Sequence, residues 1–136
     1  MSMPASFQIR GAGVAGLSVA SALVARGAQV SVYDPHGVPD THCCSWWAGG
    51  MLAPFCEGEA AEEPVVRLGQ KAASWWQVQG VDVVQKGSLV VALARDKSEL
   101  TRFARRTKQH QVVDEDGIAA LEPDLVGRVR QGLFFE

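Results

Sequence analysis

The 136-residue chain has little of what marks several large classes of protein. It has only three cysteines, Cys43, Cys44 and Cys56, and their odd number and lack of a Cys-x-x-Cys spacing argue against a disulfide framework and a zinc site. Reduced thiols are usual in the cytoplasm, so we expect a cytoplasmic protein. The formal net charge is only −2, which indicates no surface for nucleic acid or another polyanion.

Long apolar runs are also missing. The mostly apolar stretch 14–25 is too short to span a bilayer, so no membrane association is expected. Its length would suit the apolar region of a secretory signal peptide, but three glycines open it and Arg26-Gly27 closes it. We therefore interpret it as a helix of a folded domain. No internal repeat or low-complexity segment occurs.

The first third of the chain has the pattern of a strand, a helix and a second strand. Residues 7–9 form a short apolar stretch before the first glycine, and residues 14–26 have helical periodicity. Gly27 is placed to end that helix, and the β-branched run 29–33 (QVSVY) follows at once. This order predicts a βαβ unit with parallel strands. The expected apolar face of the helix consists of Leu17, Ala20, Leu23 and Val24.

The rest of the chain predicts a mixture of helices and strands. We expect, in order, a functional loop over 35–56, a helix over 64–79, a hairpin over 81–94 turning at 86–87, a helix over 96–110, a strand at 112–113, a brief helix ending near 121 and a strand over 128–135. The helix over 64–79 should direct Val65, Leu68, Ala72, Trp75 and Trp76 toward a core. Asp96 and Glu99 have the spacing of a capping box, and Asp114 should cap the brief helix. The final strand has no visible partner after it.

A glycine-rich loop, Gly11-x-Gly13-x-x-Gly16, lies between the first expected strand and the helix. Gly11 suits the tight turn out of the strand, the bare backbone at Gly13 lets a diphosphate approach, and Gly16 lets the helix pack close to the strand. The diphosphate would then lie at a helix N-terminus, where N–H groups and the helix dipole favour negative charge. By itself the pattern is weak, and an ordinary strand-to-helix turn is the alternative.

Asp34 strengthens the hypothesis of a dinucleotide site. It follows the second expected strand, 18 positions after Gly16, close to the spacing of roughly 20 at which a carboxylate binds a ribose hydroxyl. An acidic residue here repels a 2′-phosphate, so NADP is disfavoured. The loop and the carboxylate do not separate NAD from FAD.

Residues 44–54, with the sequence CSWWAGGMLAP, resemble the flavin-contacting loop of the D-amino-acid oxidase superfamily of FAD enzymes. Within that superfamily the resemblance is closest to the glycine oxidases of the thiamine pathway. Residues 56–64, 87–92 and 121–125 share it. The resemblance covers nearly the whole chain, and residues 48–54 are its most specific part.

The resemblance implies FAD as the cofactor and no metal. The residues that it implies for cofactor binding are Gly11, Gly13, Val14, Ala15, Gly16, Asp34, Pro35, Cys44, Ser45, Gly49, Gly50 and Met51. Val14 and Ala15 would offer N–H groups to the diphosphate, with Cys44 and Ser45 also along it. Asp34, with Pro35 beside it, would bind the adenosine ribose. Residues 49–51 would run against the isoalloxazine ring, because a flat ring needs close backbone approach.

The implied fold is α/β, with a Rossmann-type FAD-binding portion over residues 1–80 and the beginning of an α+β substrate domain over 81–136. The implied activity is oxidative deamination of glycine or a similar small amine, with dioxygen as acceptor and peroxide as product, in thiamine thiazole synthesis. No side chain is expected to act as a catalytic acid or base, since the cofactor carries the chemistry. Enzymes of this kind form homo-oligomers, so a homo-oligomer is expected.

Several alternatives stay open. The resembling enzymes are much longer, so we interpret the chain as part of such an enzyme, or as a dinucleotide-binding module without activity of its own. An NAD-linked dehydrogenase would share the glycine loop but would give no reason for Gly49-Gly50-Met51. Trp46 and Trp47 are more simply hydrophobic anchors of their loop than stacking partners of a flavin. His42 is more simply a surface histidine than a covalent flavin attachment point.

Overall fold

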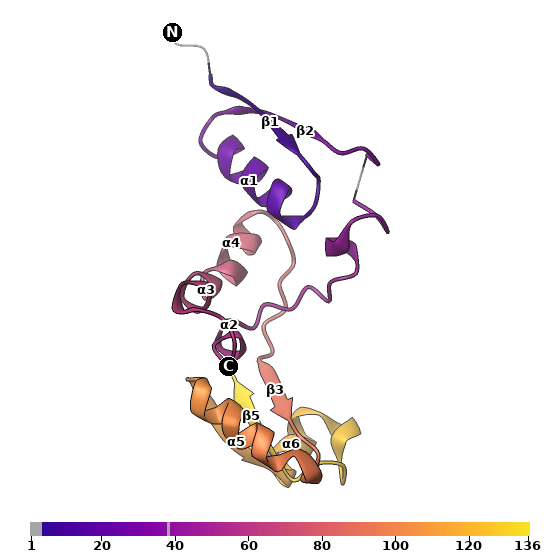
Figure 1. Cartoon of the computed structure of the whole chain (residues 1–136), viewed down its shortest axis with the longest axis vertical. Coiled ribbons are helices and arrows are strands. Elements are labelled where there is room, and N and C mark those ends of the chain that lie inside the picture. Colours follow the sequence, from indigo (N-terminus) through magenta and orange to yellow (C-terminus); the bar gives the residue numbers. More distant parts are fainter. Residues whose placement is uncertain (1–3, 38) are drawn as a thin grey trace. The chain divides into compact units, whose positions relative to one another are not determined.

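The computed structural model describes residues 4–37 and 39–136. The chain divides into two compact units, Met1–Met51 and Leu52–Glu136, and both contain helices and strands (Figure 1). The fold is therefore α/β, as the sequence predicts. The predicted boundary near residue 80 between a cofactor portion and a substrate portion stays a prediction.

The first unit is built on a βαβ arrangement. Strand β1 (Ser6–Arg10) and strand β2 (Gln29–Tyr33) are parallel, with Ser6 opposite Gln29 and Arg10 opposite Tyr33. Helix α1 (Val14–Val24) connects them and packs against both strands. It ends two residues before the predicted point, and Gly27, with φ of +80°, lets the chain turn into β2. The predicted pair of parallel strands is confirmed.

This unit buries little apolar surface. Ala12 and Ala20 are its buried apolar residues within the described range. Leu17 and Val24, which the helical periodicity assigns to a covered face, are 38% and 58% exposed, so that expectation is wrong for both. A sheet of two strands is too narrow to cover the side of a helix, and only the residues directly above the strands lose contact with water.

The segment after Met51 begins with short helices. These are α2 (Pro54–Glu57), α3 (Glu63–Gly69) and α4 (Ala72–Val78), so the single helix predicted over 64–79 is wrong. The break follows Gly69, a weak helix former whose added Cβ would lie 3.0 Å from the Cβ of Pro54. Val65 and Leu68 are exposed instead of facing a core. Trp75 and Trp76 are half-buried, with their rings edge to face at 4.7 Å.

The second unit contains a three-stranded antiparallel sheet. Strands β3 (Ser88–Val91), β5 (Gln131–Phe135) and β4 (His110–Asp114) lie in the order β3-β5-β4. The final strand therefore has two partners, and the prediction that it lacks one is wrong. The predicted hairpin over 81–94 is also wrong, because β3 pairs with β5 instead of with the residues just before it. Pairing between distant segments is not visible in local patterns.

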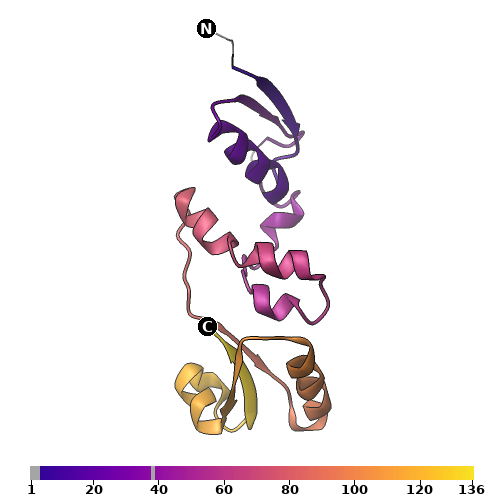
Figure 2. The ribbon, with the colours of Figure 1, turned by 90° about the vertical axis from the view of Figure 1, so that its left-hand side faces the viewer.

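Two helices cover opposite sides of this sheet (Figure 2). Helix α5 (Lys97–Arg106) follows a 3₁₀ turn, η2 (Ala94–Asp96), and helix α6 (Glu115–Leu121) precedes another, η3 (Pro123–Leu125). Because β5 lies between two strands and two helices, Gly132, Leu133 and Phe135 are all buried. None of the helices within the described ranges has the length and apolar character needed to cross a bilayer.

The helix starts in this unit differ from each other. Asp114 caps α6 as predicted, since its Oδ1 accepts the N–H of Gly117 at 3.0 Å. The predicted capping box at α5 is wrong, because the Asp96 side chain accepts no capping bond from α5. Asp96 ends a 3₁₀ turn with φ of −108° and ψ of 20°, which is not the extended backbone that a capping residue needs. Its carboxylate lies instead 3.3 Å from Nε of Arg95.

The core of the second unit lies between α5 and the sheet. Leu100, Leu133 and Phe135 form its buried cluster, and Phe103 packs edge to face on Phe135 with ring centroids 6.3 Å apart. On the other helix, α6, Ile118 is 1% exposed. The buried cluster therefore lies on the α5 side, and Ile118 is buried separately on α6, the helix that contacts β4 and β5.

We expect Ile118→Ala to destabilise the chain by about 2–5 kcal/mol, because it removes buried methyl groups and leaves a cavity. Leu121→Ala on the same helix is the matched control, since Leu121 is 44% exposed and should cost less than about 1 kcal/mol. Urea unfolding followed by circular dichroism measures both. Equal losses for the two variants would contradict this assignment of the core.

Candidate dinucleotide site

The glycine loop joins the carboxyl end of β1 to the start of α1. Gly11 has φ of +97°, in the left-handed region that favours glycine, and its N–H donates to the carbonyl of Tyr33 at 2.8 Å. This bond ties the loop to the end of β2. Two segments that are far apart in the sequence therefore meet at the same end of the parallel strands.

Gly16 sets the distance between α1 and the loop. A Cβ added at this position would overlap the carbonyl oxygen of Gly11 and would lie 3.4 Å from Cγ2 of Ile9 on β1. Backbone atoms cannot move aside as a flexible side chain can, so the position requires glycine. The close packing of helix on strand that the motif predicts is present in the structure.

The start of α1 offers N–H groups that the helix itself does not use. The first turn of an α-helix leaves its N–H groups without intrahelical acceptors. Within the described residues, no side chain of the first turn or of the N-cap Gly13 caps α1, and that turn contains no acidic residue. The N–H of Val14 donates to Oγ of Ser45 at 3.1 Å. The positive end of this helix is therefore not neutralised by a carboxylate of its own.

Ser45 brings the long loop onto the start of the helix. It belongs to the 3₁₀ turn η1 (Cys44–Trp46). A Cβ added at Gly13 would lie 3.4 Å from its Oγ and 3.2 Å from Sγ of Cys43. A larger residue at position 13 would therefore fill the space between the two loops. The Ser45 hydroxyl accepts from Val14 and keeps its own proton for a further acceptor.

Asp34 is turned toward the glycine loop. Its Oδ2 accepts the N–H of Ala12 at 2.8 Å, and its Oδ1 accepts the N–H of His36 at 3.0 Å. These two hydrogen bonds, with Ala12 contributing most, hold the pKa of Asp34 below its ordinary value of 3.8. The carboxylate is therefore negatively charged at neutral pH, and each oxygen retains lone pairs for a further donor.

The first unit contains every residue predicted to bind the cofactor. The structure brings Gly11, Gly13, Val14, Gly16, Asp34 and Ser45 together through the hydrogen bonds and close approaches above. Ala15 is an exposed residue of the first turn of α1, and Pro35 and Cys44 are exposed next to Asp34 and Ser45. The roles assigned to these residues in cofactor binding stay predictions.

Residues 49–51 lie at the end of the unit. A Cβ added at Gly49 or Gly50 would meet no described atom within 4 Å, and Met51 is 77% exposed. Trp46 and Trp47 are 57% and 71% exposed, so the expectation that they are buried anchors is wrong. Trp47 is held instead by a hydrogen bond from its Nε1 to the carbonyl of Thr41. A polar tip gives this exposed ring a fixed partner.

Sequence reasoning did not identify several groups of this site, some next to Asp34 and some next to Gly13. The N–H of Ala12 and the thiol of Cys43 have no signature in the sequence, because their positions depend on how two distant loops meet. The stacked rings of His36 and His42 were likewise not foreseen. Only the turn at Asp34-Pro35-His36 has a local signal, since an aspartate commonly accepts the N–H two residues later.

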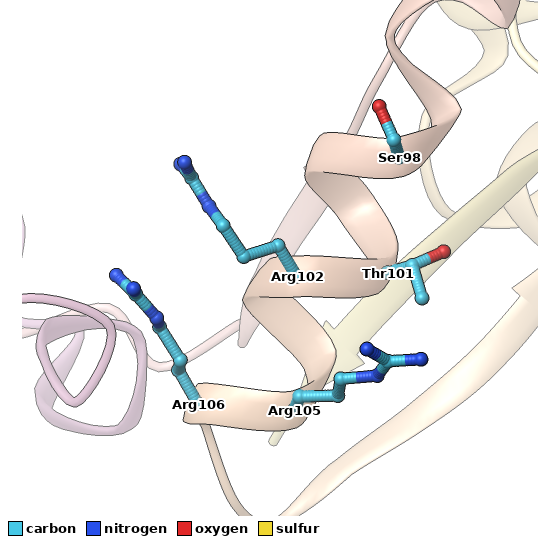
Figure 3. Close-up of a pocket in the computed structure, with 5 residues that line it drawn as sticks. All are labelled: Ser98, Thr101, Arg102, Arg105 and Arg106. Carbon is cyan, nitrogen blue, oxygen red and sulfur yellow. The ribbon is translucent and has the colours of Figure 1, made fainter.

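The second unit has a cavity of about 450 Å³ on the surface of α5, far along the chain from these residues. It is lined by Ser98, Thr101, Arg102, Arg105 and Arg106 (Figure 3). Arg102 and Arg106 form ion pairs with Glu59, at 3.5 and 3.1 Å. Both arginine side chains are 55% exposed, and ion pairs so accessible to water contribute little to stability. Within the described ranges, no group of three or more His, Cys, Asp or Glu is placed to hold a metal ion.

Comparison with known proteins places these features in a family. The family model DAO, described as FAD dependent oxidoreductase, matches residues 8–136. ThiO of Rhizobium etli, a thiamine biosynthesis oxidoreductase by name, is 52% identical over 128 residues, which are 93% of this chain and 39% of that protein. The chain therefore spans about two fifths of the length of this relative. No solved structure matches the chain.

We expect the Asp34 carboxyl to titrate below 3.8, because the N–H groups of Ala12 and His36 stabilise its charged form. A depressed pKa stabilises the fold above 3.8, and this contribution is lost as the pH falls through the pKa of the folded state. Asp34→Asn should therefore lower the thermal midpoint at pH 7 and have little effect well below pH 3.8. Carboxyl ¹³C NMR and pH-dependent thermal unfolding measure the two quantities. A titration midpoint above 3.8 would contradict the hydrogen bonds seen here.

We expect Gly16→Ala to destabilise the first unit by about 3 kcal/mol, at the upper end of ordinary overpacking, because the new methyl group meets backbone. Gly49→Ala is the matched control, since its added Cβ meets nothing within 4 Å. Hydrogen exchange of the β1 and β2 amides reports on this unit separately from the rest of the chain. Equal exchange in the two variants would show that α1 does not approach Gly11 as closely as described.

Proposed function

The chain belongs to the DAO family of FAD-dependent oxidoreductases, and on this premise we propose that its first unit is a Rossmann-type FAD site serving the oxidative deamination of glycine or a similar small amine. The observation that carries the proposal is the bond from the Ala12 N–H to Asp34 Oδ2, at 2.8 Å. It holds a carboxylate beside the start of α1, so that one group able to bind a ribose and one able to bind a diphosphate lie at the same end of two parallel strands.

The geometry of the glycine loop fits a diphosphate. The start of α1 presents N–H groups and the positive end of the helix dipole, and its first turn contains no acidic side chain within the described residues. The lack of a side chain at Gly13 leaves room between the glycine loop and Ser45. Val14, Ala15 and the Ser45 hydroxyl would hold the diphosphate, and Cys44 would lie beside it. In this arrangement Val14 acts in part through Ser45, whose Oγ accepts its N–H.

The negative charge of Asp34 helps to identify which nucleotide the site would bind. A carboxylate that stays ionised binds the hydroxyls of an adenosine ribose and repels a 2′-phosphate. This disfavours NADP. Membership of the family favours FAD over NAD, and Gly49, Gly50 and Met51 would lie along its ring system, where main-chain amides tune the readiness of a flavin to accept electrons.

Bound FAD would supply the two-electron oxidation of the substrate. Glycine would lose two electrons and two protons to give an imine, which water hydrolyses to glyoxylate and ammonia, while dioxygen takes up the electrons and protons as hydrogen peroxide. No side chain of the first unit is assigned as acid or base in this proposal. Its residues bind and orient the cofactor, so their contribution to rate is positional.

The pathway that we propose is taken from the name of the similar protein. Because ThiO of Rhizobium etli is named for thiamine biosynthesis, we propose that this chain serves the same pathway, in which the imine of glycine would pass to thiazole synthesis. The cytoplasm, a homo-oligomeric state and the absence of nucleic-acid and membrane partners belong to the same proposal.

We expect the purified chain to bind FAD, with absorption near about 450 nm, and to release FAD instead of NAD on denaturation. Gly13→Val should weaken FAD binding at least about tenfold, because its side chain occupies the space between the glycine loop and Ser45. Val24→Ala, at a residue of the same unit that is 58% exposed and lies outside the proposed site, is the control for general effects of substitution. Binding is measured by quenching of flavin fluorescence, with circular dichroism to establish that each variant is folded.

Activity is tested separately by peroxide formation with glycine and with sarcosine. Peroxide with either amine supports the proposed oxidase. FAD binding without peroxide would support a dinucleotide-binding module in its place. Release of NAD would overturn the assignment of the cofactor.

A further inference from the structure

Two histidines lie face to face beside Asp34. The ring centroids of His36 and His42 are 3.9 Å apart, and the ring planes are inclined by only 14°. Six positions separate the two residues along the chain. Nothing in the proposed binding of diphosphate and ribose uses these rings.

Hydrogen bonds fix the backbone on both sides of the stack. The N–H of His36 donates to Asp34 Oδ1 at 3.0 Å, and the N–H of His42 donates to Asp40 Oδ1 at 2.9 Å. Asp40 also lies 3.8 Å from Nε2 of His42. The stacked pair is therefore anchored to the same carboxylate that is proposed to bind the ribose. Both rings are close enough to Asp34 for their charge, when present, to lower its pKa.

We propose that His36 and His42 form an aromatic platform for the base of the bound nucleotide, an inference that rests on the proposed dinucleotide site. A base is joined directly to the ribose, so a ribose held by Asp34 brings the base close to the residues that follow β2. Both histidines are exposed, and the His42 side chain retains 55% of its accessible surface. Each ring has one face on its partner and offers the other to a flat ligand.

The chemistry of the pair suits a base better than a phosphate. Bases stack on aromatic side chains with little dependence on sequence, because every base has a π-face. Asp34 and Asp40 place two negative charges next to the rings, which disfavours an anionic group there. A diphosphate is instead served by the start of α1, which has no acidic residue in its first turn as described.

The test compares ligands with and without a base. Binding of ADP, inorganic pyrophosphate and FAD to the full 136-residue chain is measured by calorimetry for the wild type and for His36→Ala, His42→Ala, His36→Phe and His42→Phe. Thr41→Ala, in the same exposed loop, is the control, since it removes neither ring and its carbonyl still accepts from Trp47. We expect each alanine variant to bind ADP and FAD about tenfold more weakly, with pyrophosphate unchanged, and each phenylalanine variant to restore the affinity.

The outcomes separate this inference from the proposed function. Unchanged ADP affinity in both alanine variants overturns the platform, as does an equal loss for ADP and pyrophosphate, which would show a purely structural role. If the wild type binds ADP but not FAD, the FAD assignment fails, and a loss of ADP affinity in the alanine variants still supports the platform. A wild type that binds neither ADP nor FAD overturns both.

Discussion

The close approach of α1 to the glycine loop is the constraint on which the first unit depends. A Cβ at Gly16 would overlap the Gly11 carbonyl, so this helix can lie against the strands only with glycine at that point. The approach places the first N–H groups of α1 at the carboxyl ends of β1 and β2. Without it, the helix would start farther out, and neither Asp34 nor Ser45 could reach its neighbourhood. The charged groups of the site can therefore come together only because position 16 is a glycine.

The electrostatics follow from which groups the fold brings together. The N-terminus of a helix favours negative charge, yet the first turn of α1 supplies no acidic side chain within the described residues. The carboxylate of Asp34, which lies outside the helix, accepts the N–H of Ala12, one residue before the N-cap. The positive helix end and the negative carboxylate thus lie at the same end of the two parallel strands. Such a pair of opposite charges matches a ligand that carries a diphosphate at one point and sugar hydroxyls at another.

The sequence predicted the features that local backbone chemistry determines. The glycine turn, the end of α1 near Gly27 and the Asp114 cap depend on residues a few positions apart. The parallel strands pair residues 23 positions apart, but the order strand, helix, strand predicts that pairing. It did not predict the position of β5 between β3 and β4, since the pairing of β5 with β3 joins residues more than 40 positions apart and no turn signal marks it. Nor did it predict the break after Gly69, where packing against Pro54 overrides helical periodicity. In the site, Asp34 could be predicted from its spacing to Gly16, whereas Cys43 and Ala12 have no comparable signal in the sequence.

The small core of the first unit links its stability to its ligand. Ala12 and Ala20 are its buried apolar residues as described, while Val24 and Tyr33 are 58% and 65% exposed. A two-stranded sheet has little stability of its own, because three or more strands or further packing are needed to bury an apolar face. A ligand that binds only the folded state adds about 2.7 kcal/mol when present at a hundred times its Kd. Because the core of the first unit is so small, the stability added by a bound ligand is large by comparison. Nucleotide binding and ordering of the glycine loop are therefore best understood as one coupled equilibrium.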